Sequence, residues 1–149
     1  MAPTLTADGR RRLAHERNLW LSTVRPDGRA HLAPVWFVFV ADRLWVVTGR
    51  SSVRVANLRA NPAAAASLED ADRPLVATGR VTVHDHVRPG PLVDAFAVKY
   101  GWDVTVEVDD DLGELVLLEM EVSTWHHPGR PAGPDAPGAR VERRPWRGQ

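Results

Sequence analysis

The chain has 149 residues, a length that suits one domain built around a single hydrophobic core. Apolar residues make up 44% of it and charged residues 26%, as in an ordinary soluble globular protein. The formal net charge is zero and there is no cysteine. These values argue against binding to nucleic acid or an anionic membrane surface, and they exclude disulfides and thiolate chemistry.

Nothing in the sequence indicates targeting to or through a membrane. The first 18 residues lack the apolar core of a secretory signal. The longest apolar run, residues 33–41, is far shorter than the roughly 20 residues that span a bilayer. We therefore expect a cytoplasmic protein.

The N-terminal half predicts a short helix followed by three strands. Residues 6–17 form the amphipathic helix, with Asp8 as a candidate cap. The strands are expected at residues 19–24, 31–40 and 44–48, separated by two short polar turns. Such a series forms an antiparallel meander, with Trp20 and Trp45 assigned to its core.

The C-terminal half predicts two helices and three further strands. The first helix is expected at residues 51–60, capped by Ser51 or Ser52 and stopped by Asn61-Pro62. Strands at 63–68 and 75–83, a helix at 89–100 and a strand at 115–122 follow. Residues 1–125 thus form the domain. Residues 126–149 are rich in Pro, Gly and Arg, and are expected to be an extended or partly disordered tail.

Six antiparallel strands around one small core favour a closed β-barrel, because closure removes exposed strand edges. The second strand is apolar on both faces, so its outer face needs a cover. A second copy of the chain is the simplest cover, and we expect a homodimer. The predicted fold class is mainly β with short helices.

A candidate anion site lies at residues 48–57, where the third strand ends and a helix begins. The first turn of a helix has unpaired N–H groups and the positive end of the helix dipole, which favour an anion. Two arginines and several hydroxyls accompany it, and the arginine fork suits a phosphate. The pattern predicts a phosphate-binding pocket, although a capping serine near arginines is also common on protein surfaces. The candidates are Thr48, Arg50, Ser51, Ser52, Arg54 and Asn57.

Three segments in order resemble the pyridoxamine-phosphate-oxidase-like split-barrel superfamily, and most of all its branch of F420-dependent flavin/deazaflavin oxidoreductases. They are LSTVRPDGRAHLAPVWFVF, LWVVTGRSSVRVANLRANP and a strand containing ATGRV, and the helix around AFAVKY fits as well. The resemblance implies a six-stranded split β-barrel homodimer with cofactor clefts at the subunit interface.

The resemblance also implies roles for individual residues. Pro34, Val35 and Trp36 would lie along the ring system of the cofactor. Thr48, Ser52 and Arg54 would hold its phosphate, with Asn57 supporting the loop and Arg50 as an additional cation. The family usually has lysine at the position of Arg54 and a basic residue at the position of Ala56. Gly79 is either a site of close ligand approach or a strand glycine at a bulge. Trp36 has a core position as its alternative.

The histidines and the acidic run have simpler interpretations. His84 and His86 alternate along an expected strand, and His126 and His127 adjoin the tail. Four histidines can form a metal or haem site, but solvated histidines are the simpler interpretation, and no metal is expected. Asp109-Asp110-Asp111 suits a solvated turn.

The expected function is transfer of a hydride between F420 and a small organic acceptor. The cofactor carries this chemistry, so no dedicated acid or base is required and none is evident. The alternatives are an FMN-binding oxidoreductase of the same fold, and a non-catalytic binder of haem, another tetrapyrrole or a cofactor.

Overall fold

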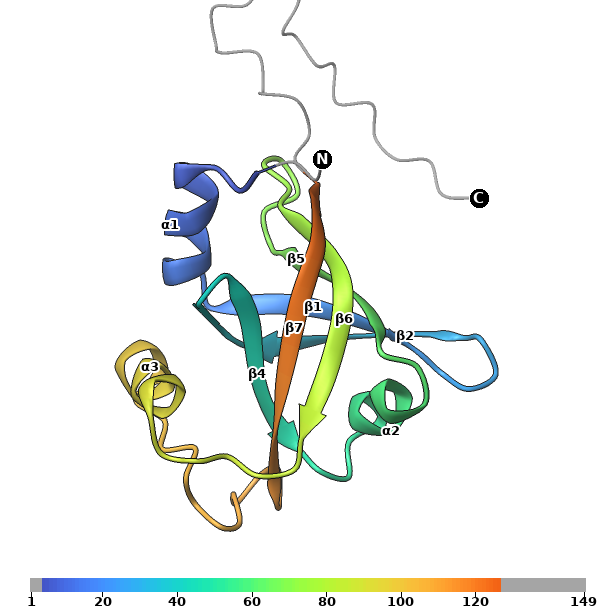
Figure 1. The fold of residues 1–149 in the computed structure, drawn as a ribbon, viewed down its shortest axis with the longest axis vertical. Helices are drawn as coiled ribbons and strands as arrows, with labels where there is room; N and C mark the ends of the chain where they lie inside the picture. The colour runs from blue at the N-terminus through green and yellow to red at the C-terminus, as the bar shows by residue number, and fades with distance from the viewer. Residues whose placement is uncertain (1–3, 127–149) are drawn as a thin grey trace, which may run out of the picture.

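Three helices and seven strands make up residues 4–126, the part of the chain that this computed structural model describes (Figure 1). In chain order they are α1 (Ala7–His15), β1 (Asn18–Val24), β2 (Ala30–Trp36), β3 (Val38–Val40), β4 (Arg43–Gly49), α2 (Val53–Ala60), β5 (Ala63–Leu68), β6 (Val76–His84), α3 (Pro91–Tyr100) and β7 (Leu115–His126). No helix among them is long and apolar enough to cross a membrane.

The seven strands form one curled antiparallel sheet in the order β2-β1-β5-β6-β7-β4-β3. The two edge strands, β2 and β3, follow each other in the chain with only Phe37 between them. β2 pairs with β1, whereas β3 pairs with β4, so one continuous segment closes the curl by changing partner. The mainly β fold is confirmed. The expected count of six strands is wrong because the segment at residues 31–40 divides at this change of partner.

Tyr100, at the end of α3, forms hydrogen bonds with the backbone at Phe37, where β2 and β3 are divided. Its hydroxyl accepts a hydrogen bond from the Phe37 amide at 3.0 Å and lies 2.6 Å from the Arg17 carbonyl oxygen, to which it donates. The Phe37 carbonyl oxygen is also within 2.9 Å. A residue between two strands has no ladder partner of its own, and a buried unpaired amide is costly. The Tyr100 side chain therefore joins α3 to the closure of the sheet.

The core occupies both faces of the sheet. The inside of the curl holds the larger cluster, which includes Leu19, Leu44, Val55 and Leu118. The second cluster lies beneath α3 and is centred on Phe96, which is completely buried. In Figure 1, α3 and α2 lie at opposite sides of the lower end of the sheet. Because both faces of the sheet pack against other parts of the fold, its strands can have apolar residues on both sides.

Two expected helix caps differ from the structure. The Thr6 hydroxyl, not Asp8, caps α1 by accepting a hydrogen bond from the Gly9 amide at 3.0 Å. Ser52 occupies the N-cap position of α2, but its side chain makes no capping hydrogen bond. Thr6 therefore has the usual capping role, whereas the Ser52 hydroxyl is left for another partner.

Trp20 is not in the core, contrary to expectation. Its side chain is 40% exposed on the outer face of β1, and Leu32, 61% exposed, projects from the same face of β2. Pro34 and Trp36 continue this apolar surface along β2 because alternate residues of a strand face the same way. We call these four residues the β1–β2 outer face.

The last strand is longer than expected. The sequence predicts a strand at residues 115–122, whereas β7 extends to His126 and pairs with β6 beyond a bulge at Thr78/Gly79. The tail expected at residues 126–149 falls, from residue 127 onward, outside the described residues.

Candidate functional site

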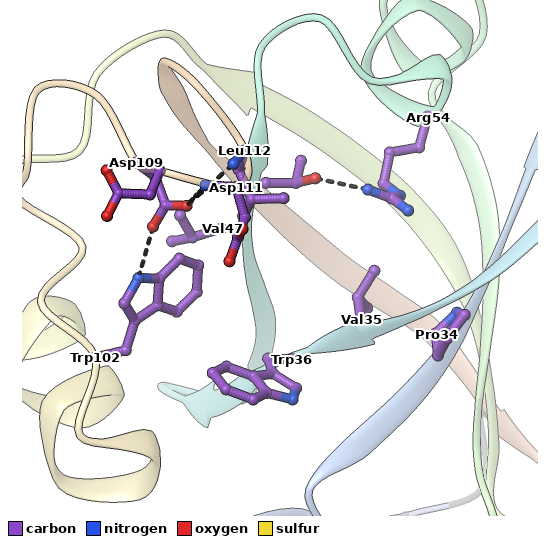
Figure 2. A pocket seen from close by; sticks show the side chains of 11 residues that line it. Pro34, Val35, Trp36, Val47, Arg54, Trp102, Asp109, Asp111 and Leu112 are labelled. Atoms are coloured by element: carbon purple, nitrogen blue, oxygen red, sulfur yellow. Dashed lines mark hydrogen bonds between the residues drawn. The ribbon is translucent and has the colours of Figure 1, made fainter.

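A pocket of about 490 Å³ opens between β2 and β4, near the start of α2 (Figure 2). Two loops complete its wall: the segment after α3, which carries Trp102, and the turn before β7. In Figure 2, Arg54 and Trp102 lie on opposite sides of the opening, and Trp36 lies between them. The lining residues are Pro34, Val35, Trp36, Val47, Thr48, Arg54, Trp102, Asp109, Asp110, Asp111 and Leu112.

Arg54 supplies an uncompensated positive charge at one end of the pocket. Its Nη1 atom donates to the Thr48 hydroxyl at 2.7 Å, and its Nε atom is buried without a hydrogen-bond partner. No carboxylate of the described residues lies within salt-bridge distance of it. Burial lowers the pKa of this guanidinium from its usual value, but an arginine remains charged at neutral pH. A half-buried cation of this kind is stabilised by an anionic ligand.

The start of α2 adds polar groups beside Arg54. The Ser52 hydroxyl is buried and has no hydrogen-bond partner. The first N–H groups of a helix have no carbonyl partner within the helix, and they carry the positive end of its dipole. Arginine, hydroxyl and helix start together form a polar corner that matches a phosphate.

Contacts at both ends of α2 hold this corner in place. Asp85, just after β6, accepts hydrogen bonds from Arg50 before the helix at 2.8 Å and from Arg59 in its last turn at 2.6 Å. These arginines hold the pKa of the Asp85 carboxyl below its usual value, with Arg59 the larger contribution. Inside the fold, the Asn57 amide donates to the Thr23 hydroxyl at 3.0 Å, and both side chains are buried. We call Arg50, Asp85 and Arg59 the Asp85 clamp.

Aromatic rings form the floor of the pocket. Trp36 is 40% exposed and stacks on Tyr100 with ring centroids 4.5 Å apart. Trp102 meets Trp36 edge to face at 5.8 Å. Arg17 lies over the Trp36 ring at 5.4 Å. An exposed, rigidly supported indole offers a flat apolar surface to a ring-shaped ligand.

An acidic turn forms the wall opposite Arg54. Asp109 accepts from the Asp111 and Leu112 amides at 2.9 and 3.0 Å and from the Trp102 indole at 3.2 Å. The Asp111 amide contributes most to holding the pKa of the Asp109 carboxyl below its usual value. Asp109 is thus a structural residue of the turn, which fixes Trp102 at the edge of the pocket.

The structure brings five of the ten predicted site residues to the pocket wall: Pro34, Val35, Trp36, Thr48 and Arg54. Ser52 lies at the adjoining helix start, Ser51 is exposed beside it, and Asn57 is buried behind it. Arg50 lines a neighbouring pocket and binds Glu114 at 2.9 Å as well as Asp85. Gly79 lies at the bulge of β6, outside the pocket lining.

Sequence reasoning missed part of this site. Trp102 and the 109–112 turn come from irregular segments, and no local pattern placed them opposite residues 48–54. The run of three aspartates is the available signal, but on its own this pattern predicts a solvated turn. The loop positions were therefore not foreseen.

His84 and His86 are not among the residues that line the pocket. His84 Nε2 lies 2.9 Å from the Glu119 carboxylate, and its ring stacks on Trp45. β6 ends at His84, so His86 lies beyond the strand and lines the neighbouring pocket instead. His126 ends β7, and His127 lies outside the described residues. Within residues 4–126 no group of three or more metal-binding side chains is found.

The chain belongs to the pyridoxamine 5'-phosphate oxidase family, whose model matches residues 5–128. The superfamily suggested by the sequence motifs is therefore confirmed. A comparison with curated proteins finds no match.

Solved structures of similar proteins share the fold. An F420 reductase is 24% identical with a TM-score of 0.61, over 76% of this chain and 92% of that one. The haem storage protein HutZ from Vibrio cholerae is 16% identical with a TM-score of 0.65, over 84% and 95% of the two chains. An FMN-binding protein from Nostoc punctiforme is 19% identical with a TM-score of 0.55, over 79% and 76%. At these identities the likeness establishes a common fold and leaves the ligand of this chain open.

Proposed function

We propose that this protein is an oxidoreductase that binds F420, or alternatively FMN, in the pocket between β2 and β4. The observation that carries the proposal is the pairing of an uncompensated Arg54 with an exposed indole in the same pocket, beside the unpartnered Ser52 hydroxyl at the adjoining start of α2. A phosphate-bearing ring system matches this arrangement in both charge and shape. The F420 reductase and FMN-binding structures of the same fold support the choice of cofactor class.

The residues present fit such a cofactor. Arg54, Ser52 and the start of α2 would hold the phosphate, and Thr48 orients the Arg54 guanidinium. Pro34, Val35 and Trp36 would face the ring system, with Trp102 closing the far side. When bound, the cofactor supplies hydride transfer, so the protein's part is to bind, orient and exclude water. A proton-transferring side chain is not required for that part.

F420 and FMN are distinguished by their spectra and by their charge. The notable difference is the polyglutamate tail of F420, which requires a further basic groove. We propose F420 first because of the motif resemblance. Purified protein that is yellow with flavin absorbance bands would decide for FMN, whereas saturable quenching of F420 fluorescence would support F420.

We expect Arg54→Ala to weaken cofactor binding by about 1–3 kcal/mol, because the variant removes a charged hydrogen-bond partner of the phosphate. Fluorescence titration with F420 and FMN measures the change. Arg29→Ala is the matched control, because Arg29 is an exposed arginine that pairs with Asp27 in the β1–β2 turn. Unchanged affinity in Arg54→Ala, at normal stability, would remove this residue from the site.

We also propose that two copies pair through the β1–β2 outer face, which would place the cofactor cleft at the interface. Leu32 and Trp20 are large apolar side chains on one exposed face, and such patches indicate protein contacts. Leu32→Asp is expected to convert a dimer to a monomer in sedimentation equilibrium. The control is Val98→Asp on α3, a residue that is 88% exposed but lies on another element. A wild-type protein that sediments as a monomer at micromolar concentration contradicts the proposal.

The haem-binding alternative has less support. A histidine is the usual axial ligand for such a group, but His84 pairs with Glu119 and His86 lines the neighbouring pocket. Titration with haem alongside F420 and FMN, followed by thermal melting, tests all three because a ligand of the native state raises the melting temperature.

A further inference from the structure

Four buried side-chain atoms of the described residues lack a hydrogen-bond partner, and three of them belong to one neighbourhood. Arg54 Nε and Ser52 Oγ are at the start of α2, and His31 Nδ1 is the third. The fourth, Arg12 Nη2, belongs to α1. Buried polar atoms normally find partners, so a group of unpaired ones marks a place where a ligand or ordered water would bind.

His31 projects from β2 toward the elements that carry the anion site. It lies opposite Thr23 in the β1–β2 pairing, and the Thr23 hydroxyl accepts the hydrogen bond from Asn57 of α2. It shares the inner face of β2 with the buried Val35, which lines the pocket. Two positive charges act on its ring, Arg54 from α2 and Arg25 from the β1–β2 turn.

We propose that His31 is a third binding residue of the phosphate site and takes up a proton when a phosphorylated ligand binds. This inference rests on the proposed function and deepens it, since it names ligands that carry a phosphate group as the class that the protein prefers at mildly acidic pH. Neutral imidazole has one donor nitrogen, whereas imidazolium donates from both. Protonation therefore makes Nδ1 a donor whichever tautomer the neutral ring has, and it adds a positive charge beside the phosphate oxygen.

The charges around the His31 ring determine how the affinity for a phosphorylated ligand changes with pH. In the free protein, burial lowers the pKa of His31 below its usual value, and the charges of Arg25 and Arg54 add to this effect. Asp27 and Arg29 of the β1–β2 turn pair with each other. The negative charge of a bound phosphate group opposes the charges of both arginines and favours imidazolium. The pKa in the complex is therefore higher than in the free protein, and between the two values affinity falls as pH rises.

The test compares ligands with and without phosphate over a range of pH. Wild-type protein and His31→Asn are titrated with FMN, riboflavin, F420 and its phosphate-free deazaflavin alcohol between pH 5.5 and 8. For the phosphorylated ligands, we expect the wild-type affinity, divided by that of the variant at the same pH, to fall about tenfold across this range, which corresponds to a change of one pKa unit. That ratio cancels the second ionisation of the FMN phosphate near pH 6. Riboflavin and the alcohol should show no such change.

A second readout separates this inference from the proposed function. The imidazole signals of His31 are followed by nuclear magnetic resonance with and without inorganic phosphate. A higher pKa in the presence of phosphate supports the inference even if no flavin binds, which would overturn only the proposed oxidoreductase. Conversely, flavin binding with the same pH dependence in wild type, His31→Asn and His31→Gln overturns the inference and leaves the proposed function intact. Using two variants guards against a folding defect in either one.

Discussion

Replacing Gly79 with alanine should destabilise the fold by about 3 kcal/mol, at the upper end of the range for overpacked sites. A Cβ atom at this position would lie 2.0 Å from the Glu121 carbonyl oxygen and 3.0 Å from the Val122 Cα. Both neighbours are backbone atoms of β7, beside the bulge where β6 and β7 change register. Backbone in the middle of a sheet cannot move aside without losing ladder hydrogen bonds. The close approach at Gly79 is thus between the backbones of β6 and β7.

Urea denaturation of Gly79→Ala measures this loss, with Gly28→Ala as the control. Gly28 has a φ of 86° in the β1–β2 turn, and a Cβ there would meet nothing within 4 Å. Its substitution should cost only about 1–2 kcal/mol, the price of a left-handed backbone for an L-residue. If Gly79→Ala keeps full stability and loses cofactor affinity instead, the glycine serves the ligand.

The second large effect is expected for Tyr100→Phe, which should destabilise the protein by about 1–3 kcal/mol. The variant keeps the ring that stacks on Trp36 but removes the hydroxyl that accepts from the Phe37 amide and donates to the Arg17 carbonyl. Each buried group left without a partner costs about 1–3 kcal/mol. The lost hydrogen bonds lie where β2 continues into β3.

Chemical denaturation gives the magnitude, and hydrogen exchange gives the location. The Phe37 amide should lose protection in Tyr100→Phe more than amides in the centre of β6 and β7. Thr105→Val is the control, because the Thr105 hydroxyl bonds only to the exposed Asp103 carboxylate nearby. A loss in Tyr100→Phe no greater than in this control would mean that water replaces the hydroxyl at the closure.

Local patterns in the sequence were enough to predict most elements. The turn at Pro26-Asp27-Gly28, the stop at Asn61-Pro62 and the alternating strands are short-range signals, and they located the strands and helices within a few residues. The division at Phe37 was missed because it follows from a change of partner strand, β1 before it and β4 after it. A partner change depends on how the whole sheet curls, which no window of sequence contains.

The candidate site likewise has residues that local sequence predicts and residues that depend on distant parts of the chain. Arg54 and Ser52 were predictable because a strand end followed by a helix start is a local feature. The surroundings of Arg50 were not, because its carboxylate partners Asp85 and Glu114 are 35 and 64 residues away in the chain. His31 was unremarkable as one residue of an apolar strand. Only the tertiary structure shows its unpartnered nitrogen.

The Asp85 clamp has a consequence for the kinetics and energetics of binding. With Arg50 and Arg59 fixed to one carboxylate, α2 is held at both ends before any ligand arrives. A preorganised receptor loses little conformational entropy on association. Capture of a phosphorylated ligand should then resemble docking onto a rigid surface, with rate constants set by diffusion and charge attraction instead of by slow loop ordering.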